Sequence, residues 1–187
     1  MIGPEFPQVL SAAARGDEEA FGRLWHDLQP RVLRYLAVVS PAAAEDLASE
    51  TWLGVVRGIE RFRGTEPAFR AWVFTIARHE ALDWRRRAAR RPTEDLAVDG
   101  LMEQVAPDDP AAAAVEGFST RAALAVVSTL PAGQAEAVVL RVVAGLEVNQ
   151  VAEIMDKRPN TVRVLTHRGL RRLAERLGDD ARIRRVV

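Results

Sequence analysis

The sequence contains no cysteine, and no apolar run in it approaches the roughly 18 residues that a membrane-spanning helix requires. Without cysteine there is no disulfide framework and no cysteine-based metal site. Because no basic segment leads into an apolar stretch near the N-terminus, the sequence predicts no signal peptide either. We therefore expect a cytoplasmic protein with no membrane contact of its own.

An excess of charge of one sign is also missing, since 26 Lys and Arg residues balance 26 Asp and Glu residues. A net charge of zero argues against polyanion binding by the whole chain, but positive and negative residues are segregated along the sequence. Basic residues are concentrated in residues 61–91 and 157–185, whereas the charged residues of 94–116 are all acidic. Two basic blocks therefore flank one acidic segment.

No segment alternates as a β-strand does, and the apolar spacing is helical, which predicts an all-α fold. We expect helices over residues 17–38, 41–62, 67–90, 118–129, 131–144, 148–155 and 159–177. Ser40 before Pro41 predicts a helix start in which the serine side chain caps free backbone amides. At 187 residues and 48% hydrophobic content, the chain suits one ordinary domain or two small ones.

The helical spacing fails between residues 92 and 117, where prolines, acids and alanines dominate. Such a segment cannot bury enough apolar surface to pack, which predicts a flexible acidic linker. It would join a domain of residues 1–91 to a smaller one of residues 118–187. We expect these two domains to behave as separate units.

Residues 146–173 combine a short apolar-periodic helix, a break at 156–159 and a second, arginine-rich helix, which is the pattern of a helix-turn-helix. The predicted buried face of the second helix comprises Val162, Leu165, Leu170 and Leu173. The side chains left for its outer face are Arg163, His167, Arg168, Arg171 and Arg172. Such a helix fits the major groove of DNA, although a solvated basic surface helix would show the same pattern.

The segment 62–72 mixes aromatic residues with arginines between two predicted helices. Aromatic faces stack on unpaired bases while guanidinium groups hold the phosphate backbone, so the mixture favours single-stranded nucleic acid. The Trp84-Arg85-Arg86-Arg87 run would extend the phosphate track. The alternative is that Trp72, Phe74 and Trp84 are ordinary core residues.

Asp46 and Glu50 lie one helical turn apart and suggest either a catalytic carboxylate pair or an acidic docking patch. No general acid–base partner is near them in sequence, so we favour docking and expect no catalytic residue. His79 and Asp83 have helical i,i+4 spacing, but two ligands do not make a metal site. We expect neither a metal nor another cofactor.

The order of these motifs resembles the sigma-70 family of RNA polymerase sigma factors, in particular its extracytoplasmic-function (ECF) group. Residues 17–21, 46–51 and 69–78, followed by Asp83 and Arg86, resemble sigma region 2. Residues 129–131, 151–155 and 160–163 resemble sigma region 4. Each motif alone is degenerate, whereas their order and spacing together are specific.

The resemblance implies an alternative sigma factor that directs promoter-specific transcription initiation and is held inactive by an anti-sigma factor. Its implied partners are core RNA polymerase, through the β′ clamp helices and the β flap, and promoter DNA. Docking on the clamp helices is implied for Asp46, Leu47, Ser49, Glu50 and Val56. Binding of the −10 element is implied for Gly64, Thr65, Glu66, Phe69, Arg70, Trp72, Arg78 and His79. Binding of the −35 duplex is implied for Asn160, Thr161, Arg163, Val164, His167 and Arg168.

Two positions depart from the family pattern: Gln150 stands where glutamate is usual, and Val164 where a serine is common. Val164 favours apolar contact with a thymine methyl group, so the −35 sequence cannot be copied from the family. A rival hypothesis is a free-standing regulator that binds operator DNA and dimerises through its N-terminal helices. An enzyme remains the other alternative, and only the Asp46/Glu50 pair supports it.

Overall fold

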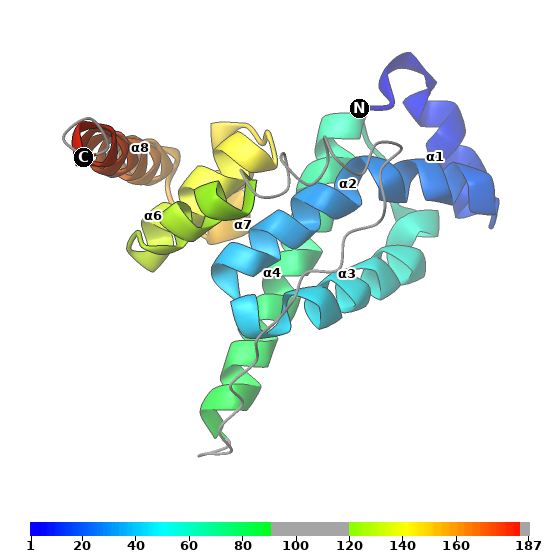
Figure 1. Cartoon of the computed structure of the whole chain (residues 1–187). Helices are drawn as coiled ribbons and strands as arrows, with labels where there is room; N and C mark the ends of the chain where they lie inside the picture. The colour runs from blue at the N-terminus through cyan, green and yellow to red at the C-terminus, as the bar shows by residue number, and fades with distance from the viewer. Residues whose placement is uncertain (91–119, 184–187) are drawn as a thin grey trace, which may run out of the picture.

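The computed structural model describes residues 1–90 and 120–183, with side chains described as far as Arg176. We call residues 1–90 the N-terminal lobe and residues 120–183 the C-terminal lobe. Both lobes are built from helices, and neither described range contains a strand, which confirms the all-α prediction (Figure 1). The predicted linker, residues 92–117, lies outside the described residues.

Four α-helices form the N-terminal lobe: α1 (Phe6–Ala14), α2 (Glu18–Val39), α3 (Ala44–Gly58) and α4 (Glu66–Arg90). Short 3-10 turns precede α1 (Gly3–Glu5) and α3 (Pro41–Ala43) and follow α3 (Ile59–Arg61). The sequence predicted α2, α3 and α4 but not α1. Phe6, Val9 and Ala13 have helical spacing and are buried, so the signal for α1 was present.

The predicted cap at Ser40 was wrong. Its side chain makes no capping hydrogen bond, and its buried hydroxyl has no partner among the described residues. The chain instead enters a 3-10 turn at Pro41, whose missing amide leaves one fewer donor to satisfy.

The C-terminal lobe begins with a helix over residues 120–128, then α6 (Ala132–Val138), a π-helical turn (Val139–Val143), α7 (Val148–Met155) and α8 (Pro159–Ile183). The turn between α7 and α8 contains Asp156 in the left-handed conformation, with φ of +52°. One predicted core position was wrong: Leu170 is 44% exposed. Gly169 faces α6 instead, and a Cβ there would lie 2.6 Å from Val138 Cγ2, so only glycine allows this approach.

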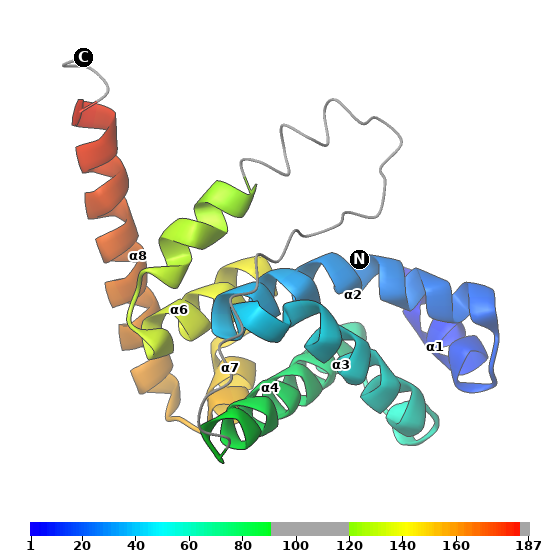
Figure 2. The same ribbon diagram turned by 60° about the horizontal axis from the view of Figure 1, so that its bottom comes forward.

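The two lobes pack against each other rather than standing apart as the sequence predicted. The π-helical turn and α6 contact α2, and α7 contacts α4 (Figure 2). Tyr35, Leu36 and Phe74 of the N-terminal lobe belong to the same buried apolar cluster as Val139 and Leu140 of the C-terminal lobe. Burial of apolar surface therefore stabilises the contact between the lobes.

Candidate functional surfaces

The outer side of α3 carries an acidic and apolar surface, which we call the α3 face: Asp46, Ser49, Glu50, Leu53 and Val56. All five are exposed, and Leu53 and Val56 are 49% and 53% exposed although both are large and apolar. Exposed apolar groups beside charges are typical of a protein-binding surface.

Leu47, which the sequence assigned to the same surface, is only 5% exposed and belongs to the core. Leu53 was missed, although its spacing from Ser49 and Val56 places all three on one helix face. On the buried side of α3, Trp52 fixes the helix against α2, because its indole N–H donates to Gln29 Oε1 at 2.6 Å.

The start of α4 and the preceding loop form an aromatic cluster. The rings of Phe62 and Trp72 are stacked with centroids 5.1 Å apart, and Phe69 contacts both rings. Phe69 is 1% exposed and so belongs to the core, contrary to its predicted contact with bases. Phe62 and Trp72 are half-buried, and Gly64 and Thr65 in the loop are exposed.

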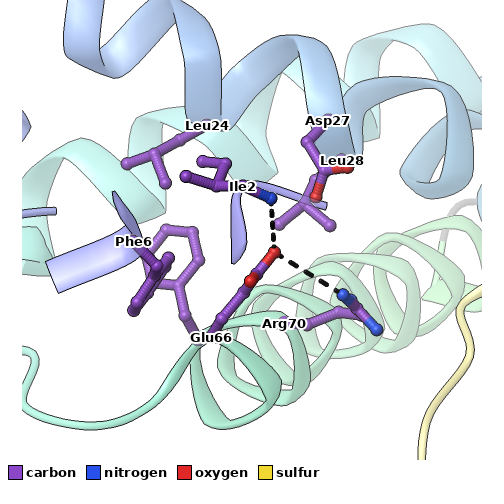
Figure 3. Close-up of a pocket in the computed structure, with 8 residues that line it drawn as sticks. Ile2, Phe6, Leu24, Asp27, Leu28, Glu66 and Arg70 are labelled. Atoms are coloured by element: carbon purple, nitrogen blue, oxygen red, sulfur yellow. Dashed lines mark hydrogen bonds and ion pairs between the residues drawn. The ribbon is translucent and has the colours of Figure 1, made fainter. Parts of the chain in front are cut away.

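Glu66, the first residue of α4, is held by the N-terminal segment. The backbone N–H of Ile2 donates to Glu66 Oε1 at 2.8 Å (Figure 3), and that of Gly3 donates to Oε2 at 2.9 Å. The Glu66 carboxylate is therefore hydrogen-bonded within the protein, whereas the family resemblance implied that Glu66 binds the −10 element.

Arg70 is also buried, at 6% exposure, which conflicts with a direct role in DNA binding in this conformation. Its Nη2 lies 3.9 Å from Glu66 Oε1, too far for a hydrogen bond (Figure 3). Nε and Nη2 have no hydrogen-bond partner among the described residues. Buried donors without hydrogen bonds are costly, so an acceptor that reached Nε or Nη2 would stabilise the protein.

Arg78 reaches across to the C-terminal lobe. Its Nε donates to Glu136 Oε1 of α6 at 2.8 Å, and its Nη2 lies 3.5 Å from the Met155 carbonyl oxygen of α7. The hydroxyl of Tyr35 in α2 donates to the same Glu136 oxygen at 3.1 Å. Burial raises the pKa of Tyr35 well above its usual value, and the negative charge of Glu136 adds to this, so the hydroxyl remains a donor.

The C-terminal half of α4 is strongly basic and open to solvent. His79, Arg86, Arg87 and Arg90 are exposed, and Arg85 donates to the Val39 carbonyl oxygen. Trp84 is half-buried against the core and Phe74 is fully buried, so the core interpretation holds for Phe74.

The start of α8 presents the outer face predicted for a DNA-recognition helix. Every residue predicted to bind the −35 duplex is exposed there: Asn160, Thr161, Arg163, Val164, His167 and Arg168. Val162 is fully buried and anchors the helix from below. At the start of α7, the N-cap residue Glu147 and Gln150 form a capping box in which Gln150 Oε1 accepts the Glu147 N–H at 2.9 Å. The helix pair therefore has the packing of a helix-turn-helix.

Comparisons with known proteins match both lobes to one family. Residues 24–91 match the model of sigma-70 region 2, and residues 120–173 match that of sigma-70 region 4. The chain is 35% identical over 179 residues to the ECF RNA polymerase sigma factor BldN of Streptomyces coelicolor, covering 94% of this chain and 67% of BldN. It is 33% identical to the ECF RNA polymerase sigma factor ShbA of Streptomyces griseus, covering 88% of this chain and 91% of ShbA.

The chain belongs to the ECF sigma factors of the sigma-70 family. The resemblance inferred from motif order is thereby confirmed, and this sigma factor falls among proteins that direct promoter-specific transcription initiation rather than in a class of enzymes. Its fold is similar to that of CnrH, solved in complex with the cytosolic domain of CnrY. The TM-score is 0.60 at 20% identity, and the match covers 92% of this chain and 96% of CnrH.

Within the described ranges of this sigma factor, no three His, Asp or Glu residues are grouped closely enough to hold a metal ion. Of the helices that the structure describes, none has the length and apolar character needed to cross a bilayer.

Proposed function

We propose that the α3 face docks this sigma factor on the β′ clamp helices of core RNA polymerase. Asp46 and Glu50 supply the charge, and Leu53 and Val56 supply exposed apolar surface beside them, further along α3. Apolar anchors surrounded by charges give both affinity and orientation at an interface. Leu47 supports the helix from the core and does not itself contact the polymerase.

The loop of residues 62–65 and the adjacent part of α4 bind the melted −10 strand. Gly64, Thr65, Trp72 and His79 offer exposed or half-exposed groups, and the basic end of α4 continues toward the phosphates. Stacking on an aromatic ring is sequence-tolerant and contributes about 1–3 kcal/mol per base. Arg70 and Arg78 join this surface only when their present surroundings change.

The exposed start of α8 binds the −35 element as duplex DNA. Arg163 and Arg168 are suited to guanine edges or phosphates, and Val164, 39% exposed, to a thymine methyl group. The observation that carries the whole proposal is that the acidic α3 face and this basic α8 face lie on separate lobes. One chain can thereby hold polymerase and promoter together.

The remaining assignments are proposed from the sequence pattern and by analogy with the family. Residues 1–91 and 118–187 act as the two functional domains, with residues 92–117 as the linker in the polymerase channel. The C-terminal domain also contacts the β flap, and an anti-sigma factor keeps the protein inactive by covering its polymerase-binding surfaces. The protein itself catalyses no reaction.

The docking proposal is tested by Asp46→Arg with Glu50→Arg, measured as binding to purified core polymerase. We expect the double variant to lose binding while its helical circular dichroism is unchanged, because like charges replace complementary ones. Glu19→Arg is the matched control for Asp46→Arg, since both acids are exposed in the first turn of a helix. Binding by the double variant equal to that of the Glu19→Arg protein would refute the proposal.

A further inference from the structure

We propose that, in the free protein, the C-terminal lobe masks the −10 surface, by which we mean the loop of residues 62–65 and the adjacent part of α4. In this closed state Glu136 binds Arg78 as a DNA phosphate would. This inference rests on the proposed −10 role of α4. It goes beyond that role because it assigns Glu136 and Gln150 to an intramolecular contact that competes with single-stranded DNA.

Glu136 is well placed for this competition. It is a carboxylate, so it accepts hydrogen bonds from a guanidinium group with the charge and geometry that a phosphate oxygen offers. Its bond to Arg78 Nε is 2.8 Å long, and the two side chains are only 18% and 17% exposed. Tyr35 donates to the same oxygen, which fixes the carboxylate against the N-terminal lobe. While this contact persists, Nε of Arg78 is occupied and the side chain is largely shielded from DNA.

Gln150 makes a second contact, on the loop side of α4. Its Oε1 accepts the Glu147 N–H within the capping box, and its Nε2 donates to the carbonyl oxygen of Pro67 at 3.0 Å. Glutamine can do both at once because its amide carries an acceptor and a donor. Glutamate in its place would keep the capping box but would present an acceptor to the Pro67 carbonyl oxygen.

The two contacts flank the buried Arg70. A Cβ placed on Gly145, which precedes α7, would lie 3.6 Å from Arg70 Nη1, so the C-terminal lobe lies close to one end of this side chain. Separating the lobes would therefore release Arg78, move Gly145 away from Arg70 and free the carbonyl oxygen of Pro67 together. The same movement would expose apolar surface of both lobes, which favours the closed state until another partner holds the C-terminal lobe.

Two measurements on the full chain test this proposal. Because the chain has no cysteine, Arg57→Cys and Ala132→Cys, both at exposed positions, place one label on each lobe for distance measurements. The second measurement is binding of a fluorescent single-stranded −10 oligonucleotide by the free protein. Both are made on Glu136→Gln and on Gln150→Glu. Glu153→Gln and Gln8→Glu make the same charge changes at exposed positions and serve as matched controls.

We expect one narrow label distance in the parent protein and both controls, and a broad distribution in Glu136→Gln and Gln150→Glu. Oligonucleotide affinity should rise about fivefold or more in these two variants, the range of an ordinary coupling between sites. A broad distribution in the parent protein would overturn the masking. Variants that open but bind the oligonucleotide no more tightly than the parent protein would also overturn the masking. In that case Arg78→Ala tests the −10 role of α4 separately. If this substitution weakens oligonucleotide binding, the −10 role survives; if it does not, that role fails too.

Discussion

The rings of Phe62 and Trp72 stack at 5.1 Å with an angle of 29° between their planes, and so close the loop that precedes α4. Gly58, the last residue of α3, lies beneath this stack: a Cβ there would come within 2.7 Å of Trp72 Cζ2. The glycine therefore sets the position of Trp72, and through it the shape of the proposed −10 surface.

We expect Gly58→Ala to destabilise the protein by about 1–3 kcal/mol, because the added methyl group forces Trp72 or α3 to move. Denaturant unfolding measures the effect. The matched control is Gly22→Ala within α2, where nothing lies within 4 Å of the added Cβ. That change should be neutral or stabilising, since alanine favours a helix over glycine. Equal effects of the two substitutions would contradict the close contact with Trp72.

Trp72→Ala should weaken binding of the −10 single strand by polymerase holoenzyme at a cost of about 1–3 kcal/mol, the range for one stacked base. Trp72→Phe should retain much of the affinity because it keeps an aromatic face. Binding of a −35 duplex serves as the internal control and should not change. If Trp72→Ala and Trp72→Phe were equally impaired, the ring would be acting through packing rather than stacking.

Tyr35, the only tyrosine in the chain, allows a clean alkaline titration by tyrosinate absorbance. Because burial raises its pKa, the native protein should show no ionisation near the usual pKa of about 10, whereas the unfolded chain should. The contribution of the protonated Tyr35 hydroxyl to the free energy of unfolding is then complete below a pH of about 10 and is lost as the pH rises above it. Tyr35→Phe should flatten this alkaline loss. Native ionisation at the ordinary pKa would show that the lobes leave Tyr35 open to solvent.

Arg163→Ala should weaken binding of a −35 duplex by about 1–3 kcal/mol and relax the preference at one base pair. The measurement is competition among duplexes that differ at single positions. Arg171 is also exposed and lies further along α8, so Arg171→Ala should instead weaken binding of all duplexes alike. If Arg163→Ala also reduced every affinity equally, Arg163 would contact only phosphate.

Most helices could be predicted because their limits are encoded locally. The predicted span of α7, residues 148–155, coincides with the structure, where Glu147 and Gln150 cap its start and Asp156 ends it. The helix α1 was missed because Gly3, Pro4 and Pro7 interrupt the pattern and resemble a tail. Leu170 was misplaced because apolar character suggested burial, whereas the close approach of α6 requires a residue as small as Gly169.

The exposed surfaces on α3 and α8 could be predicted in part. Helical spacing gave the Asp46/Glu50 pair and the outer arginines of α8, and the family resemblance supplied the remaining residues. Leu47 was wrongly included on the α3 face and Leu53 was missed.

The fate of Glu66, Arg70 and Arg78 could not be predicted from sequence. Their environments depend on residues far along the chain, such as Glu136, 58 positions beyond Arg78. No local periodicity encodes a contact of this kind between two lobes.

The most direct test of the central claim is run-off transcription by purified core polymerase with and without this protein. Because the promoter sequence is unknown, genomic fragments serve as templates and the transcript ends are sequenced. We predict transcripts that start downstream of a shared pair of −35 and −10 sequences, that require the protein, and that disappear with Asp46→Arg and Glu50→Arg. If the protein fails to bind core polymerase, or if the transcripts do not depend on it, the assignment of this chain as a working sigma factor is contradicted.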